Sequence, residues 1–453
     1  MTCFLPPLTP VQTCPLSYLP STNLICRFWL RGVRSRGLLC RFQHRRSKAS
    51  KSEKSILADT GPLLERIDSR DLAKNVSVTD STQVTLSGYE FLSSYNWADK
   101  EAPTIYVPGA PPAFKSKQLP FHVTKDQGAF FVDQNTFRCS RYPAEALFRS
   151  LAVMQPNLDM RDIDLVTDRN NLRKLLHFVS QTVDRSFRID VKFHGGVVFF
   201  SRWEPELRQT ILSGQNLGFG HGFEREVTAF DEEISDSTAH HRVVRYSLGG
   251  IRCLVRYEAD AYWEGNGEER GGKGPVVGNE GDPGETDGQI GREEADGVLD
   301  SFESMRAATP EDTQVASVKV LHRGRLVPPS AVAELKTRAI YRTFDLKTAI
   351  PQLWFAQTPN ILVGYHYKGQ FKKIQKISVK PKFQKWEKEN KRDLRKLVCL
   401  IEKIMELSRQ SYDRGYIVVC EVDDPFHLRI YESQKGGKVL PEDIINQYEW
   451  PCE

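Results

Sequence analysis

The chain has 453 residues, of which 40% are hydrophobic and 27% charged, and its formal net charge is +5. These values fit a globular protein of one large or two ordinary domains, and they exclude a chain with a strong overall basic field. The nine cysteines include no Cys-x-x-Cys pair, which argues against a zinc site and favours free thiols in a reducing compartment. No apolar run reaches the roughly 18–20 residues that a membrane helix needs, so we expect no transmembrane segment.

The first 52 residues contain no Asp or Glu but nine Lys or Arg. An acid-free, Arg-rich start is typical of a mitochondrial transit peptide, and a disordered basic arm is the alternative, since five early prolines oppose an amphipathic helix. We expect residues 1–88 to be a disordered leader and linker. The expected location is the nucleus or cytoplasm, or the mitochondrion if the start is a transit peptide.

Residues 89–453 have the patterns of a single folded domain in which hairpins and helices follow one another. Apolar residues repeat at helical spacing after Pro143, after Asp168 and between Phe383 and Arg409. Paired glycines predict β-hairpin turns at Gly195-Gly196 and Gly249-Gly250. The expected class is α+β, with mixed, mostly antiparallel central sheets flanked by helices and no βαβ alternation.

One segment interrupts this pattern. In residues 264–298, eleven of the 35 residues are glycine and acids outnumber bases ten to three. Such a composition buries too little apolar surface to become ordered. We therefore expect a disordered acidic insertion over residues 264–312, between two core strands.

Two short acidic motifs flank this insertion. Side chains at i and i+2 of a strand share one face at about 6–7 Å spacing, so Glu258 and Asp260 should project together, as should Glu334 and Lys336. Paired strands carrying these motifs would gather carboxylates and one ammonium in a small volume. Hard divalent cations prefer such oxygen ligands, which predicts a site for Mg²⁺ or Mn²⁺.

Other motifs are weaker. Arg169 and Lys174 should lie near a helix N-terminus capped by Asp168, a position suited to phosphate, although a solvated basic face is the simpler explanation for this segment taken alone. His240-His241 has no further ligand at metal-binding spacing, so buried or surface histidines are the simpler interpretation. The chain has neither a Gly-x-Ser-x-Gly elbow nor a P-loop.

The order of these motifs resembles the DXO/Rai decapping exoribonucleases, which have the PD-(D/E)xK nuclease fold. The similar segments cover roughly residues 90–410, and each is short, so their order carries the resemblance. They are Thr167-Asp168-Arg169-Asn170-Asn171-Leu172-Arg173-Lys174, Gly220-His221-Gly222-Phe223-Glu224, Glu258-Ala259-Asp260, Glu334-Leu335-Lys336 and Trp354-Phe355-Ala356-Gln357. Asn170 and Arg173 depart from the family's pattern.

The resemblance implies a role for each matching residue. Glu224, Asp260, Glu334 and the main-chain carbonyl of Leu335 would hold the metal. Glu258 would hold or orient a metal-bound water. Lys336 and Gln357 would position the scissile phosphate and the attacking water, and Arg169 would hold a substrate phosphate.

The function expected from these observations is metal-dependent hydrolysis at RNA 5′ ends, of the decapping, pyrophosphohydrolase or 5′–3′ exoribonuclease type. The RNA 5′ end is the expected partner, together with a possible protein partner. Two alternatives stay open: a non-catalytic member that binds RNA or protein, and a nuclease directed at DNA.

Overall fold

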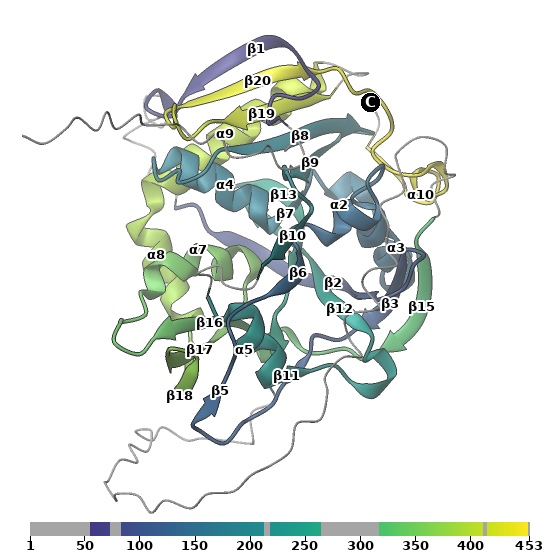
Figure 1. Cartoon of the computed structure of the whole chain (residues 1–453). Coiled ribbons are helices and arrows are strands. Elements are labelled where there is room, and N and C mark those ends of the chain that lie inside the picture. Colours follow the sequence, from purple (N-terminus) through teal and green to yellow (C-terminus); the bar gives the residue numbers. More distant parts are fainter. Residues whose placement is uncertain (1–54, 73–82, 213–217, 264–316, 411–414, 452–453) are drawn as a thin grey trace, which may run out of the picture. The chain divides into compact units, whose positions relative to one another are not determined.

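The computed structural model describes residues 55–72, 83–212, 218–263, 317–410 and 415–451. Residues 1–54 of the expected leader and the acidic insertion at 264–312 lie outside these ranges. The statements that follow concern the described residues. Their expected class is confirmed, because helices flank two large and mostly antiparallel sheets (Figure 1).

The larger sheet has eleven strands within the described ranges. In spatial order these are β1 (Thr60–Asp68), β20 (His427–Ser433), β19 (Tyr416–Cys420), β8 (Phe187–His194), β9 (Val197–Trp203), β7 (Leu165–Asp168), β13 (Ile251–Glu258), β12 (Ser237–Leu248), β2 (Leu86–Ala98), β3 (Thr104–Gly109) and β15 (Lys319–Gly324). Neighbours are antiparallel except around β7, which is parallel to β9 and β13, and between β3 and β15. The predicted glycine turns join β8 to β9 and β12 to β13, and their four glycines have positive φ.

The second sheet has seven strands in the described part of the chain. In spatial order these are β11 (Thr228–Ala229), β4 (Ala113–Phe114), β14 (Ala261–Tyr262), β16 (Val332–Ala339), β17 (Asn360–Tyr367), β18 (Gln370–Ser378) and β5 (Phe121–His122). Two further strands, β6 (Gly128–Phe131) and β10 (Arg208–Ile211), form a separate antiparallel pair.

The helices are mostly short. They are α2 (Gln134–Arg138), α3 (Glu145–Met154), α4 (Arg169–Val179), α5 (Gly220–Val227), α7 (Leu346–Ala356), α8 (Phe383–Glu389), α9 (Lys391–Arg409) and α10 (Glu442–Ile445), with 3₁₀ turns at Met160–Asp162, Glu232–Ile234, Pro329–Ala331 and Lys380–Lys382. None of the described helices is long and apolar enough to cross a membrane.

The main core joins the two sheets through α4, α7 and α9. The apolar stripe predicted for α4, which runs from Leu172 to Val179, is buried in this core, as is the stripe predicted for α9. The same core contains residues of β8, β9 and β13 from the larger sheet and of β16 and β17 from the second. The helices therefore fill the space between the sheets and hold β16 close to the end of β13.

Three expectations about the elements are wrong. A βαβ unit is present, because β16 and β17 are parallel neighbours connected by α7. The predicted helix from Phe383 to Arg409 is two helices that meet at Asn390, whose side chain donates to the carbonyl of Trp386 at 2.8 Å. In a third difference, the segment predicted as linker contains a strand.

That strand is β1, which pairs antiparallel with β20 along the edge of the larger sheet. Ile67 of this strand and nearby Leu72 are 4% and 3% exposed, so they belong to the core. The carbonyls of Ile56 and Ala58 accept hydrogen bonds from the guanidinium of buried Arg188. The alternation of polar and apolar residues in β1 is weak, and its order depends on β20 and Arg188, which lie far along the chain.

Candidate functional site

The two acidic motifs meet where the chain passes from one sheet to the other. Glu258 ends β13 of the larger sheet, whereas Asp260 directly precedes β14 of the second sheet. The expectation that both lie on one strand is therefore wrong. The motifs nevertheless become neighbours, because β14 pairs antiparallel with β16, which carries Glu334 and Lys336.

A hydrogen bond connects the motifs directly. The main-chain N–H of Leu335 donates to Oδ2 of Asp260 at 2.9 Å. Asp260 thus lies against the backbone of β16, between the side chains of Glu334 and Lys336 along the strand. The two motifs are far apart in the sequence, but the pairing of β14 with β16 makes them neighbours in the structure, as the metal-site hypothesis required.

Glu334 is the best-connected carboxylate of the site and is 3% exposed. Its Oε1 accepts from Nζ of Lys336 at 2.6 Å and from the amide of Gln352 on α7. Its Oε2 lies 3.3 Å from a guanidinium nitrogen of Arg169, the first residue of α4. A strand and two helices therefore hold this carboxylate in one orientation.

Helix α5 brings Glu224 to the same region. The helix begins on the carboxylate of Asp126, which accepts from the N–H groups of Gly220 and Gly222 at 2.9 Å each. Gly222 is required here, since a Cβ would lie 2.6 Å from a methyl carbon of Val123. Phe223 packs with Leu335 in a small apolar cluster, so α5 is fixed against β16.

Charge is unevenly balanced among these groups. Burial would raise the pKa of Glu334, but Lys336 and Arg169 outweigh it and lower that pKa to about 2. Burial would lower the pKa of Lys336, but the carboxylates of Glu334 and Asp260 raise it. Both residues of this pair are therefore charged at neutral pH.

The remaining carboxylates lack sufficient positive charge. Burial, and then the charge of Glu334, raise the pKa of Asp260 well above its ordinary value. Burial raises the pKa of Glu224 to about 7, and the negative charges of Glu258 and Glu334 add to this effect. Desolvation by the surrounding protein raises the pKa of Glu258, and the charge of Glu334 adds to this effect, although part of the side chain remains accessible to solvent.

This donor set fits a divalent cation chemically. Glu224, Asp260 and Glu334 supply carboxylate oxygens that repel one another, and an additional positive charge would relieve that repulsion. Among the described residues, no three His, Cys, Asp or Glu side chains lie close enough together to form a metal-binding group. The fit thus rests on residue type and electrostatics, and the ligand roles of these residues and of the Leu335 carbonyl remain predictions.

Gln357 does not contact Glu334 in this structure. It ends α7 in the left-handed conformation, with φ of 50°, and its amide donates to the carbonyl of Trp354 at 2.7 Å. Gln352, which the sequence analysis missed, contacts Glu334 instead. The sequence contains a signal for the start of α7, because Asp345 caps this helix by accepting from the N–H of Lys347. No local signal singles out Gln352, since its contact with Glu334 joins a helix to a separate strand.

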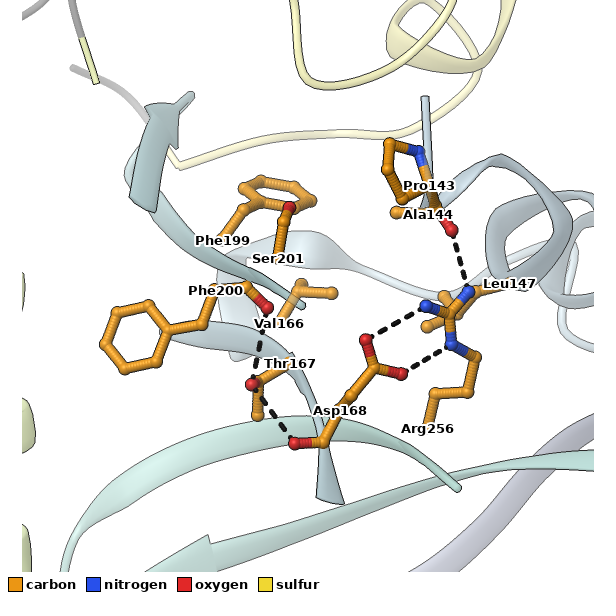
Figure 2. Close-up of a pocket in the computed structure, with 10 residues that line it drawn as sticks. All are labelled: Pro143, Ala144, Leu147, Val166, Thr167, Asp168, Phe199, Phe200, Ser201 and Arg256. Atoms are coloured by element: carbon orange, nitrogen blue, oxygen red, sulfur yellow. Dashed lines mark hydrogen bonds and ion pairs between the residues drawn. The ribbon is translucent and has the colours of Figure 1, made fainter. Parts of the chain in front are cut away.

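Arg169 is placed by a buried ion pair at the start of α4. Figure 2 shows Arg256 of β13 between the carbonyl of Pro143 and the carboxylate of Asp168. Asp168 precedes α4 as expected, but its side chain binds Arg256 and caps no helical N–H group. The guanidinium of Arg169 lies 5.5 Å from the ring centre of Tyr257, which also limits its motion.

Lys174 belongs to a different cluster. Its ammonium lies 3.0 Å from Oε1 of Glu204, and the same oxygen accepts from Arg202 at 2.8 Å. Burial lowers the pKa of Lys174, and Arg202 adds to this shift. The structure therefore places Arg169, but not Lys174, in contact with Glu334 of the candidate site. A phosphate-binding role for either residue remains a prediction.

Comparison with known proteins supports the fold. Residues 67–450 match the family model described as Domain of unknown function (DUF8563). None of the curated proteins compared with the chain matches it.

Several solved structures are similar over most of the chain. Scheffersomyces stipitis Rai1 in complex with (3'-NADP)+ and calcium ion has a TM-score of 0.50 at 11% identity, covering 85% of this chain and 98% of that chain. Candida albicans Rai1 in complex with pU5-Mn2+ has a TM-score of 0.49 at 11% identity, covering 81% and 96%. K. lactis Dxo1 in complex with manganese has a TM-score of 0.45 at 11% identity, covering 80% and 94%. The likeness to the S. stipitis protein confirms the fold expected from the DXO/Rai resemblance.

Proposed function

We propose that this chain, which belongs to the DUF8563 family, is a metal-dependent hydrolase that cleaves phosphodiester or phosphoanhydride bonds at RNA 5′ ends. The observation that carries the proposal is the meeting of Asp260, which directly precedes β14, with Glu334 and Lys336 on the paired strand β16, while a helix packed against β16 supplies Glu224. An ammonium beside acidic oxygens can bind a phosphoryl group whose charge increases during hydrolysis.

The proposed roles follow from the position of each side chain. Lys336 is fully charged and would contact a nonbridging phosphate oxygen, while Glu334 fixes its direction. Glu258 is a solvent-accessible carboxylate with a raised pKa, so it would accept a proton from the attacking water. Glu224, Asp260 and Glu334 would hold Mg²⁺ or Mn²⁺, which would supply positive charge to the phosphate and acidify water when bound.

One of the similar solved structures, with a TM-score of 0.50, is in keeping with this chemistry. Scheffersomyces stipitis Rai1 was crystallised with a calcium ion and (3'-NADP)+, which are a divalent cation and a phosphate-bearing nucleotide. The proposal names RNA and not DNA as the substrate. The experiment below decides which 5′ end is used: a cap, a triphosphate or a monophosphate.

The test supplies purified protein and Mn²⁺ with RNAs that carry a cap, a 5′-triphosphate or a 5′-monophosphate, beside the same sequence as DNA. We expect products from at least one RNA, and a loss of about 100-fold or more in rate for Glu334→Ala/Lys336→Ala. The matched control is Glu90→Ala/Arg245→Ala, which removes another carboxylate–cation pair from neighbouring strands of the larger sheet and should retain the rate.

Products that require both Mn²⁺ and the intact pair would support the proposal. RNA binding without any product from wild type would favour a non-catalytic protein instead. Cleavage of DNA alone would identify a DNA-directed nuclease.

A further inference from the structure

A strongly basic segment lies outside the site already described. From Lys368 to Lys396 the chain carries twelve Lys or Arg and three acids, although the whole chain has a net charge of only +5. Two of the acids are engaged locally: Glu387 accepts from the indole of Trp354, and Glu389 lies 3.7 Å from Lys385. The third, Asp393, accepts from Lys396 at 3.0 Å.

Most of this positive charge faces solvent. We define the β18–α8 surface by its exposed cations, which are Lys368, Lys372, Lys373, Lys376, Lys380, Lys382, Lys385, Lys388 and Arg392. They extend along β18, through the 3₁₀ turn Lys380–Lys382, across α8 and into the start of α9. On α8 the apolar residues Phe383 and Trp386 are buried, so the helix presents its lysines outward.

Protection of a sheet edge does not account for this surface. Beyond Phe371 the strand β18 has no partner on its outer side among the described strands, and lysines on such an edge prevent pairing with other chains. That explanation applies to Lys372 and Lys373. It does not apply to Lys380, Lys382 or Lys388, which lie outside any strand.

Aromatic rings alternate with the cations. The ammonium of Lys373 lies 5.7 Å from the ring centre of Tyr365, and that of Lys368 lies 5.6 Å from the ring centre of Tyr367. Tyr367 is 48% exposed, so part of its ring is available to a ligand. Cations that follow a phosphate backbone, combined with exposed aromatic rings on which bases can stack, are the features of surfaces that bind single strands.

The surface is continuous with the candidate site. Across the second sheet, Lys373 of β18 is opposite Tyr365 of β17, which is opposite Arg338 of β16. Arg338 is two residues beyond Lys336, so the two side chains leave β16 on the same face. On the other side of the surface, α8 lies beside α7, the helix that carries Gln352; both helices are labelled in Figure 1. The ring centres of Trp386 on α8 and Trp354 on α7 are 5.0 Å apart.

We infer that the β18–α8 surface binds the phosphate backbone of a single-stranded nucleic acid beyond the nucleotide held in the candidate site. The choice of a nucleic acid strand as occupant rests on the proposed function. A strand leaving the site along Arg338 and Lys373 would reach the lysines of the 3₁₀ turn and α8. Affinity should therefore increase with strand length and decrease with salt.

The test compares Lys380→Gln/Lys382→Gln/Lys385→Gln/Lys388→Gln, all outside any strand, with Lys100→Gln/Lys319→Gln/Lys435→Gln/Lys438→Gln, which removes the same charge from exposed lysines elsewhere. Binding of labelled single-stranded RNAs of about 5 and about 30 nucleotides is followed by fluorescence anisotropy in EDTA, where metal-dependent cleavage does not interfere. Circular dichroism establishes that both variants are folded.

For the long RNA, the slope of log affinity against log salt should decrease in magnitude by about 3 in the first variant, because each lost phosphate contact on a single strand contributes about 0.7. Its affinity for the short RNA should stay within about 2-fold of wild type, and the control should match wild type throughout. Equal losses in both variants, or no loss in either, would overturn the inference.

A second arm offers anionic phospholipid vesicles instead of RNA. Binding of vesicles that depends on these lysines, without lysine-dependent RNA binding, would also overturn the inference and identify a membrane surface. Since affinity is measured without turnover, a wild type that hydrolyses nothing would contradict the proposed function while leaving this test of the surface valid.

Discussion

At Glu334 one carboxylate accepts from three side chains that belong to three elements: Lys336 on its own strand, Arg169 on α4 and Gln352 on α7. Buried ions need this degree of compensation, because a carboxylate without partners loses more in hydration than burial returns. The same contacts define the direction of Lys336. The chemistry proposed for the site thus depends on the orientations of the Glu334 and Lys336 side chains, which the packing of β16, α4 and α7 sets.

Gln352 and Gln357 provide a matched pair of substitutions on one helix. Gln352→Ala removes a contact to Glu334 and should lower the rate of hydrolysis by about 10-fold or more. Gln357→Gly should retain the rate and change the free energy of unfolding by less than about 1 kcal/mol, because glycine relieves the strain of the left-handed conformation but removes the hydrogen bond to the Trp354 carbonyl. Rates and urea unfolding of both variants test this, and a rate lost only in Gln357→Gly would support the role that the family resemblance implies for Gln357.

The pKa of Glu224 predicts how stability depends on pH. A carboxyl group whose pKa is near 7 when folded and near 4.5 when unfolded binds its proton more tightly in the folded state. Its contribution is complete below about pH 4.5 and is lost as the pH rises through about 7. The melting temperature of the metal-free protein should therefore fall over this range, modestly because Glu224 is partly exposed.

Two comparisons isolate this effect. Glu224→Gln should melt with a flatter pH profile than wild type, and Mn²⁺ should stabilise wild type more at about pH 8 than at about pH 5, because metal ligands must be deprotonated. Differential scanning fluorimetry measures both. Superimposable profiles for the two proteins would show that Glu224 does not titrate as described.

At the scale of elements, the start of α4 depends on β13. The ion pair of Arg256 with Asp168 is buried, and the residue after Asp168 is Arg169. Parallel pairing of β7 with β13 brings this ion pair together, and the carbonyl of Pro143 accepts a further hydrogen bond from Arg256. The helix therefore begins at a position set by a neighbouring strand and not by a capping side chain of its own.

Arg256→Met should destabilise the fold by about 3–5 kcal/mol, because it leaves the carboxylate of Asp168 buried without its cation. The control is Arg252→Met on the same strand, where the ion pair with Asp164 is exposed and should contribute about 0–1 kcal/mol. Chemical unfolding of both variants measures the difference. Similar losses for the two would mean that burial of the Arg256 pair has little energetic consequence.

At the scale of the whole molecule, residues from both ends of the described chain form one edge of the larger sheet. β1 pairs with β20, and the carbonyls of Ile56 and Ala58 satisfy Arg188, which is only 2% exposed. The segment before the predicted domain start is therefore part of the folded unit. Its removal would expose an apolar edge and leave a buried guanidinium short of partners.

Two truncated chains distinguish the contribution of residues 55–72 to stability from that of the residues before them. A chain beginning at residue 55 should unfold at the same urea concentration as the full chain. A chain beginning at residue 73 should lose at least about 3 kcal/mol, through the lost burial of Ile67 and Leu72 and the lost hydrogen bonds of Arg188. Equal stability of the two truncated chains would contradict the role assigned to β1.

Local patterns in the sequence determined much of this protein: the buried stripes of α4 and α9, the glycine turns of two hairpins, and the residue types of the acidic site. These features are readable because periodicity and turn chemistry depend on a few neighbouring residues. Tertiary structure alone decided that Asp260 lies across a sheet boundary from Glu258, that Gln352 contacts Glu334, and that Lys174 pairs with Glu204. Each of these features involves two separate elements. Its geometry therefore depends on how strands and helices pack, which no local pattern encodes.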